Sequence, residues 1–112
     1  MCVDTVARAT LFHGLSDASR LSLVEALVGG PRRVADLIDA TGLTQSNVSK
    51  HLACLWDCGL VERERRGREI HYRLVAGIVD LLEDVDRVLA VTGDRVMACP
   101  RYELGGGTRR AA

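Results

Sequence analysis

The chain has 112 residues, a net charge of zero and four cysteines. This length suits one domain rather than two, and the balance of apolar and charged residues excludes a disordered chain. No apolar run approaches the roughly 20 residues that a membrane span requires, and the N-terminus lacks the basic start and apolar core of a signal peptide. We therefore expect a cytoplasmic protein without a membrane partner, whose cysteines are thiols or metal ligands rather than disulfides.

Two helices are predicted in the first quarter of the chain. The first covers residues 6–13. The second is clearer, because Ser16 or Asp17 can cap its start, an apolar stripe follows at helical spacing, and Gly29 and Gly30 end it.

The next two predicted helices make a helix-turn-helix. One covers residues 33–42 and ends at Gly42, and Thr44 caps the other, which runs to about Asp57. Two helices joined by a tight turn that contains glycine are typical of this motif. The side chains of the second helix that are expected to point inward are Val48, Leu52 and Leu55.

A hairpin and a last helix complete the predicted fold. From Leu60 to Val75 apolar and polar residues alternate, which predicts a β-hairpin with Gly67 at its tip. Helical spacing returns over residues 78–93, and the tail from Arg101 onward is expected to be flexible. The order of elements predicts a mainly α fold of the α+β type, a winged helix-turn-helix.

This fold is expected to form one domain over residues 1–98, followed by a C-terminal tail over residues 99–112. The first and last helices have apolar stripes and little to cover in so small a chain. We therefore expect them to pair with a second copy in a twofold homodimer.

The second helix of the helix-turn-helix and the wing carry the expected DNA contacts. Small hydroxyls and an amide at a helix N-terminus suit a major groove, and a basic hairpin tip suits phosphates. Positive charge also gathers in the middle of the chain, whereas the last helix is acidic. The alternatives are a merely solvated surface or a winged helix that binds protein, and the favoured partner is double-stranded operator DNA. The candidate DNA-binding residues are Gln45, Ser46, Asn47, Ser49, Lys50, His51, Arg65, Arg66 and Arg68.

The run from Leu43 to Leu74 resembles the core of the ArsR/SmtB family of dimeric metal-responsive repressors. Residues 17–27 resemble the preceding helix of that family, and the resemblance covers roughly residues 5–95. It implies a dimer that occupies its operator without metal and leaves it when an inducer binds. Arg20 matches a family arginine that is more often structural than a base reader.

Cys54 and Cys58 lie four residues apart and should share one face of the recognition helix, beside its apolar stripe rather than within it. Their β-carbons are expected about 5–6 Å apart, close enough for both thiolates to bind one soft cation. A tight site needs a third thiolate, which Cys99 can supply from just beyond the last helix, and Cys2 is a candidate fourth ligand. The alternatives are a buried apolar role for the pair and incidental thiols near the termini.

The family's other metal sites are excluded by this sequence. Arg33 and Ala35 stand where the arsenic-type site has cysteines, and the last helix lacks the histidines of the zinc-type site. The remaining cysteines resemble those of the cadmium/lead sensors of the CmtR type, which implies that the tail cysteine can come from the partner protomer.

A set of thiolates without imidazole suits soft ions. By resemblance the inducer is cadmium or lead, with zinc and arsenite as alternatives. An arsenite- or antimonite-responsive repressor of the same fold and a thiol-redox regulator remain open, although the latter needs an accessible thiol of low pKa. No nucleophile, base and orienting group can be assembled, so we do not expect an enzyme. The expected mechanism is that ligation of the tail to the recognition helix alters the spacing of the two DNA-reading helices.

Overall fold

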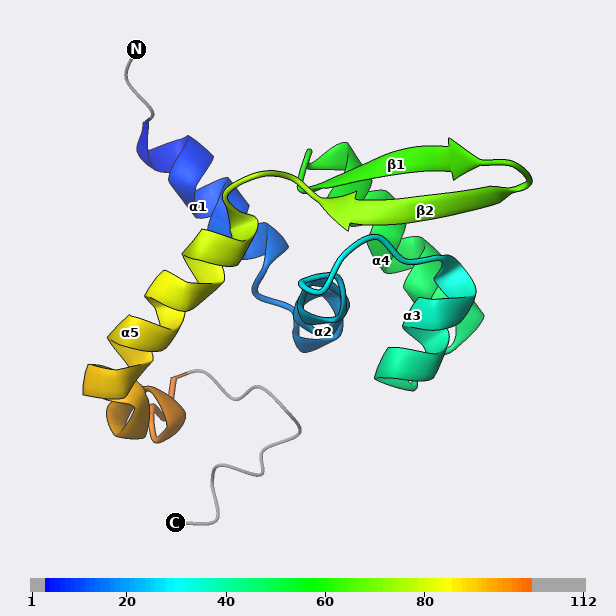
Figure 1. Ribbon diagram of the computed structural model, residues 1–112. Helices are drawn as coiled ribbons and strands as arrows, with labels where there is room; N and C mark the ends of the chain where they lie inside the picture. Colours follow the sequence, from blue (N-terminus) through cyan, green and yellow to red (C-terminus); the bar gives the residue numbers. More distant parts are fainter. Residues whose placement is uncertain (1–3, 102–112) are drawn as a thin grey trace. The chain divides into compact units, whose positions relative to one another are not determined.

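The computed structural model describes residues 4–101. The chain divides into two compact parts between Ala76 and Gly77 (Figure 1). In chain order the elements of the first part are α1 (Thr5–Gly14), α2 (Ala18–Ala26), α3 (Val34–Thr41), α4 (Gln45–Asp57), β1 (Val61–Arg66) and β2 (Glu69–Leu74), and the second part contains α5 (Ile78–Met97). This order and the antiparallel pairing of the two strands confirm the predicted winged helix-turn-helix.

The first two helices each begin at an aspartate. Asp4 caps α1 and Asp17 caps α2, where its Oδ2 accepts a hydrogen bond from the backbone N–H of Arg20 at 2.9 Å. The guanidinium of Arg20 then donates to the carbonyl oxygens of Gly14 at 2.8 Å and His13 at 3.2 Å. Arg20 therefore fastens the end of α1 to the start of α2, which is the structural role expected of it.

The turn between α3 and α4 is built from a glycine and a threonine. Gly42 has φ of 74°, a left-handed conformation that glycine adopts without a steric penalty. Two residues later, Thr44 Oγ1 accepts a hydrogen bond from the backbone N–H of Asn47 at 3.1 Å. These two local preferences place the start of α4 as predicted.

The hairpin is closed by a two-residue loop of Gly67 and Arg68, since Arg66 pairs with Glu69. Gly67 is at the predicted tip and has φ of 65°. The hairpin is the wing of the motif.

A short bridge joins the wing to the segment that precedes α3. The backbone N–H of Arg32 donates to the carbonyl oxygen of Tyr72 at 2.9 Å, and that of Tyr72 donates back at 2.8 Å. Apolar and polar residues do not alternate around Pro31, so this pairing was not predicted. It connects the start of the helix-turn-helix to β2.

The core of the first part lies where α2, α3 and α4 pack together (Figure 1). Removing one of these aliphatic side chains from water stabilises the fold by about 1.5–3 kcal/mol. The three inward residues predicted for α4 are among the buried ones. The fully buried side chains among the described residues are Leu23, Val24, Leu37, Val48, Leu52 and Leu55, together with Val61 at the start of β1.

The end of α2 differs from the prediction. The helix ends at Ala26 rather than near Gly29, and the chain leaves it through tightened turns. The N–H of Leu27 is shared between the carbonyl oxygens of Leu23 and Val24, and Gly30 donates to Leu27 at 3.1 Å. Leu27 itself is 2 % exposed and closes the buried face of α2.

The second part is a 20-residue helix, α5, which extends past its predicted end at Gly93. Gly93 lies inside the helix despite its low helix propensity. Many of its apolar side chains are exposed in the single chain, namely Val79, Val85, Val88, Leu89, Val91, Val96 and Met97. Among the described helices, none combines the length and the apolar character needed to cross a membrane.

Candidate functional site

The N-terminal half of α4 exposes a continuous set of short polar side chains. Thr44 caps this end, and Val48 is buried against the core, so the opposite face is left to solvent. Such a face can approach base edges and phosphates in a major groove. The exposed residues on it are Gln45, Ser46, Asn47, Ser49 and Lys50.

His51 differs from the other DNA-binding candidates on α4. Its side chain is only 15 % exposed, and its Nε2 lies 3.9 Å from Oδ2 of Asp17. Asp17 in turn caps α2. The imidazole therefore faces the start of α2, a position that favours support of the helix packing over the predicted phosphate contact.

The three arginines predicted to contact DNA from the wing have different surroundings. Arg66 forms an ion pair with Glu64, with Nη2 and Oε1 2.9 Å apart. Arg65 donates only to the carbonyl oxygen of Gly67, at 3.2 Å. Among the described residues, Arg65 and Arg68 have no acidic partner, so their charges are the more available ones at the tip.

An ion-paired arginine fastens the wing to α3. Arg33 Nη1 lies 2.6 Å from Oε2 of Glu69, and Arg33 Nη2 lies 3.0 Å from Oδ1 of Asp36. The Asp36 carboxylate also accepts from the backbone N–H of Arg33 at 3.1 Å, which closes the start of α3. These hydrogen bonds lower the pKa of Asp36 to about 2. This cap was not predicted, although the acidic residue three positions after Arg33 is a sequence signal for it.

Cys54 and Cys58 meet at the C-terminal end of α4. Cys58 is the residue that caps the helix, and its backbone N–H donates to the carbonyl oxygen of Cys54 at 3.0 Å. Cys54 is half-buried and Cys58 is exposed, and the two thiols are close enough for Cys54 to influence the ionisation of Cys58. Burial, the neighbouring Cys54 thiol and the charge of Asp57 all raise the pKa of Cys58.

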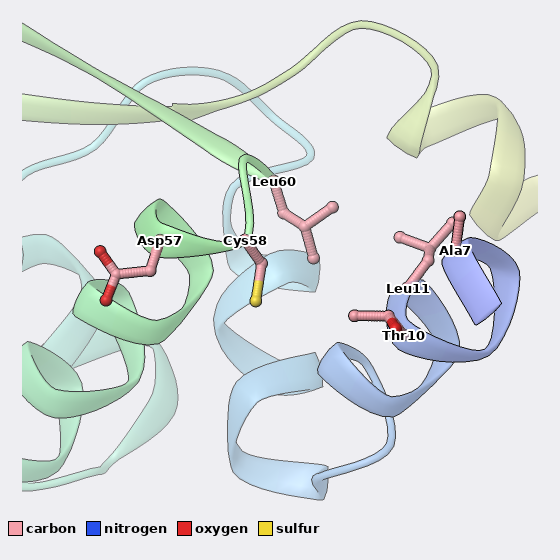
Figure 2. Close-up of a pocket in the computed structure, with 6 residues that line it drawn as sticks. All are labelled: Ala7, Thr10, Leu11, Asp57, Cys58 and Leu60. Atoms are coloured by element: carbon pink, nitrogen blue, oxygen red, sulfur yellow. The ribbon is translucent and has the colours of Figure 1, made fainter.

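The Cys58 thiol opens into a hollow between α1 and the end of α4 (Figure 2). The volume of the hollow is about 430 Å³. This hollow was not predicted, because its existence depends on the distance between α1 and α4. Its lining residues are Ala7, Thr10, Leu11, Asp57, Cys58 and Leu60.

The other candidate ligands are less constrained. Cys99 is half-buried and follows the end of α5, where its backbone N–H donates to the carbonyl oxygen of Val96 at 3.2 Å. Cys2 lies outside the described residues. In the described residues of each part, no three ligand side chains form a set that could hold a metal ion by itself. The thiol pair therefore offers two donors, fewer than a tight metal site requires.

An aromatic contact that the sequence analysis missed lies beside the cysteines. The side chain of Arg63, on β1, stacks over the ring of Trp56, on the last turn of α4. The two residues are separated by the turn at Gly59, whose φ of 76° brings the strand back across the helix end.

Residues 17–63 match the family model described as bacterial regulatory protein, arsR family. The chain is also 35% identical over 107 residues, which cover 96% of it and 84% of its relative, to a probable mercury resistance operon repressor of Streptomyces lividans. The chain belongs to the ArsR/SmtB family. The transcriptional regulator CmtR of Mycobacterium tuberculosis is 39% identical over 101 residues, which cover 88% of this chain and 86% of CmtR.

Solved structures agree with this assignment to the ArsR/SmtB family. The crystal structure of Rv0081 from M. tuberculosis superimposes with a TM-score of 0.72 and 33% identity, covering 84% of this chain and 99% of that one. The solution structure of the homodimeric winged helix-turn-helix domain of Mb0332 from Mycobacterium bovis gives a TM-score of 0.61 and 28% identity, covering 83% and 93%. The matched family model is of regulatory proteins, and CmtR and the mercury resistance repressor are named as regulators of transcription. This family member is therefore a CmtR-like repressor and not an enzyme.

Proposed function

We propose that this ArsR/SmtB repressor binds its operator as a homodimer and is released by cadmium or lead, which three thiolates hold. The proposed ligands are Cys54, Cys58 and Cys99. The observation that carries the proposal is the position of Cys54 and Cys58, which lie one helical turn apart at the C-terminal end of α4. The other end of this helix exposes polar side chains to solvent.

The donor set supports a soft ion. The two adjacent donors are both sulfur atoms. The pair contains no imidazole, which would favour a borderline ion. The similarity to CmtR and to a repressor named for mercury resistance supports the same class of ion. Cys99 is the proposed third ligand and Cys2 the candidate fourth, with zinc and arsenite as the alternative inducers.

The surroundings of Cys58 weigh against a thiol-redox regulator. Burial and the Cys54 thiol raise the pKa of Cys58, so the group is protonated at neutral pH and is a poor nucleophile toward an oxidant. A soft cation, by contrast, displaces the thiol protons when it binds.

Release follows from the two functions of α4. In the proposed mechanism its exposed N-terminal residues bind operator DNA together with Arg65 and Arg68 of the wing, and the repressor acts in the cytoplasm. Its C-terminal end carries Cys54 and Cys58, so ligation that joins Cys99 to them acts directly on the DNA-reading helix. A coupling of about 1–3 kcal/mol would weaken operator binding about 5–150-fold.

The test is an anaerobic titration of the reduced protein with cadmium, followed by thiolate-to-metal charge-transfer absorption. One ion per protomer is expected, and the absorption should fall in each of the variants Cys54→Ser, Cys58→Ser and Cys99→Ser. A Cys2→Ser variant is the matched control, since loss of a fourth ligand should weaken binding without abolishing it. Absorption that is unchanged in Cys99→Ser would contradict the three-thiolate proposal.

Operator binding supplies the second readout. Cadmium should lower the affinity of the wild-type dimer for operator DNA under reductant, and each of the three serine variants should stay bound. Parallel titrations with lead, zinc and arsenite would rank the inducers. Release that occurs with peroxide alone and is reversed by reductant would favour the redox alternative.

A further inference from the structure

The two strands of the wing separate their charges by face. Successive side chains of a strand point to opposite faces, and those of directly paired residues share a face. On one face Arg63 pairs with Tyr72, and Arg65 pairs with Ile70. This face, which we call the Trp56 face, carries no acidic residue in either strand. Its residues are Val61, Arg63, Arg65, Ile70, Tyr72 and Leu74.

The opposite face, which we call the glutamate face, carries all three acidic residues of the two strands. Arg73 Nε lies 3.0 Å from Oε1 of Glu62. Arg66 pairs with Glu64, and Glu69 pairs with an arginine that precedes α3. The arginines of this face are thus neutralised, and the unpaired positive charge of the strands gathers on the Trp56 face. The residues of the glutamate face are Glu62, Glu64, Arg66, Glu69, His71 and Arg73.

The Trp56 face borders the side of α4 that carries groove-reading residues. Arg63 stacks on Trp56, which follows Ser49 by seven residues, or about two helical turns, so Trp56 and Ser49 lie on one side of α4. Cys54 and Cys58 are each two residues from Trp56, a rotation of about 200° around the helix. The cationic face of the wing therefore lies beside the groove-reading side of α4 and away from the thiols.

We propose that Arg63 is a further DNA-binding residue and that it contacts, together with Arg65, the phosphate backbone beside the groove that α4 enters. The proposal rests on the proposed function for operator binding, and it adds a residue that the predicted DNA contacts lack. Both guanidinium groups are exposed, and among the described residues neither has an acidic partner that a phosphate would have to displace.

The geometry of the two arginines suits phosphates. Residues two apart in a strand are separated by about 7 Å, which is close to the separation of neighbouring phosphates along one DNA strand. A guanidinium that lies on an aromatic ring keeps the N–H groups at its edge free to donate to phosphate oxygens. The stack on Trp56 also restricts the Arg63 side chain before DNA arrives, which reduces the entropy lost on binding.

The test measures the affinity of the reduced, metal-free, full-length protein for DNA by fluorescence anisotropy at several salt concentrations. The probe is a labelled duplex that the wild-type protein selects from a random-sequence library. Arg63→Gln should bind about tenfold more weakly and should lower the slope of log K against log salt by about one unit. Arg63→Lys keeps the charge and should restore the slope. Arg73→Gln, on the glutamate face, is the matched control and should change neither quantity.

The salt slope distinguishes a phosphate contact from a structural role of the stack. If Arg63 only fastened the wing to α4, Arg63→Gln would lower the melting temperature and leave the slope unchanged, and this result would overturn the proposal. An equal reduction of the slope in Arg73→Gln would overturn it as well. Arg63→Met replaces Arg63→Gln if the latter does not fold, because a methionine side chain can still cover the ring.

Cadmium separates this proposal from the proposed function. Arg63→Gln should bind cadmium with wild-type affinity, since Arg63 lies away from the thiols. If cadmium released the wild-type protein from the duplex but Arg63→Gln kept the full slope, the phosphate contact would be wrong while the metal-released repressor stood. If Arg63→Gln lost the slope but cadmium released nothing, the contact would stand and the metal response would be wrong.

Discussion

The guanidinium carbon of Arg63 lies 3.9 Å from the centre of the Trp56 ring. Trp56 stands between the two cysteines in the last turn of α4, and Arg63 is the third residue of β1. The contact therefore joins the thiol-bearing end of the recognition helix to the wing. Cation–π contacts at exposed sites are worth about 0.5–1 kcal/mol.

Arg63→Ala should lower the free energy of unfolding by about 0.5–1 kcal/mol, because the stacked cation is lost. Urea denaturation followed by circular dichroism measures the change, and the Trp56 emission spectrum should shift at the same time. Arg65→Ala is the control, since Arg65 lies two residues along the same strand without an aromatic partner. An equal effect of both substitutions would show that the stack contributes nothing of its own.

Asp17→Ala should lower the free energy of unfolding by about 1 kcal/mol, because the cap of α2 is lost. The contact of Asp17 with His51 disappears as well. Thermal or urea denaturation at neutral pH is the measurement. Asp17→Asn retains an acceptor oxygen for the cap, so most of the stability should return; no recovery would assign the effect to the lost charge.

The same pair of variants tests a dependence on pH. The hydrogen bond from Arg20 lowers the pKa of Asp17 below its ordinary value of 3.8. The stabilisation is therefore complete above that value and is lost as the pH falls through the lower pKa of the folded protein. Asp17→Asn should show a smaller loss of stability on acidification than wild type, and parallel curves would contradict this assignment.

Arg65→Ala and Arg68→Ala should each reduce the dependence of operator affinity on salt. Each arginine that neutralises a phosphate contributes about one unit to the slope of log K against log salt. Arg66→Ala is the internal comparison and should change the slope less, because Glu64 already holds its guanidinium. Anisotropy titrations at several salt concentrations measure the slopes, and three equal reductions would mean that DNA displaces Glu64.

Cadmium affinity should rise as the pH increases through the neutral range and above. The pKa of Cys58 is raised by burial and by Cys54, so a proton must leave before sulfur can bind the ion. Competition titrations against a chelator at several pH values measure this, together with the rate of alkylation of Cys58. A pH-independent affinity would mean that the thiols are already ionised in the free protein.

The helices and the wing were predictable because each begins or ends at a residue with a strong local preference. Asp17, Thr44, Gly42 and Gly67 stand at the predicted caps and tip. The buried face of α4 followed from helical spacing alone. The end of α2 was misjudged because the chain leaves the helix through tightened turns that begin before the two glycines.

The candidate site was predictable only where it depends on a single helix. The spacing of Cys54 and Cys58 was sufficient to place two thiols together. The position of His51 against Asp17 and the hollow at Cys58 depend on how separate helices pack, which no local pattern encodes. Cys99 belongs to the second part of the chain, so its role as a ligand stays a prediction.

The bridge between Arg32 and Tyr72 has a consequence for the architecture of operators. The ion pair of Arg33 with Glu69 adds a second contact between the wing and the residues just before α3. Because these two contacts hold the wing to the helix-turn-helix, α4 and the wing should move as one body. The distance along the duplex between the bases read by α4 and the phosphates reached by the wing is then a constant of the protomer. Insertions inside either half of the operator should therefore weaken binding, because α4 and the wing cannot adapt to them separately.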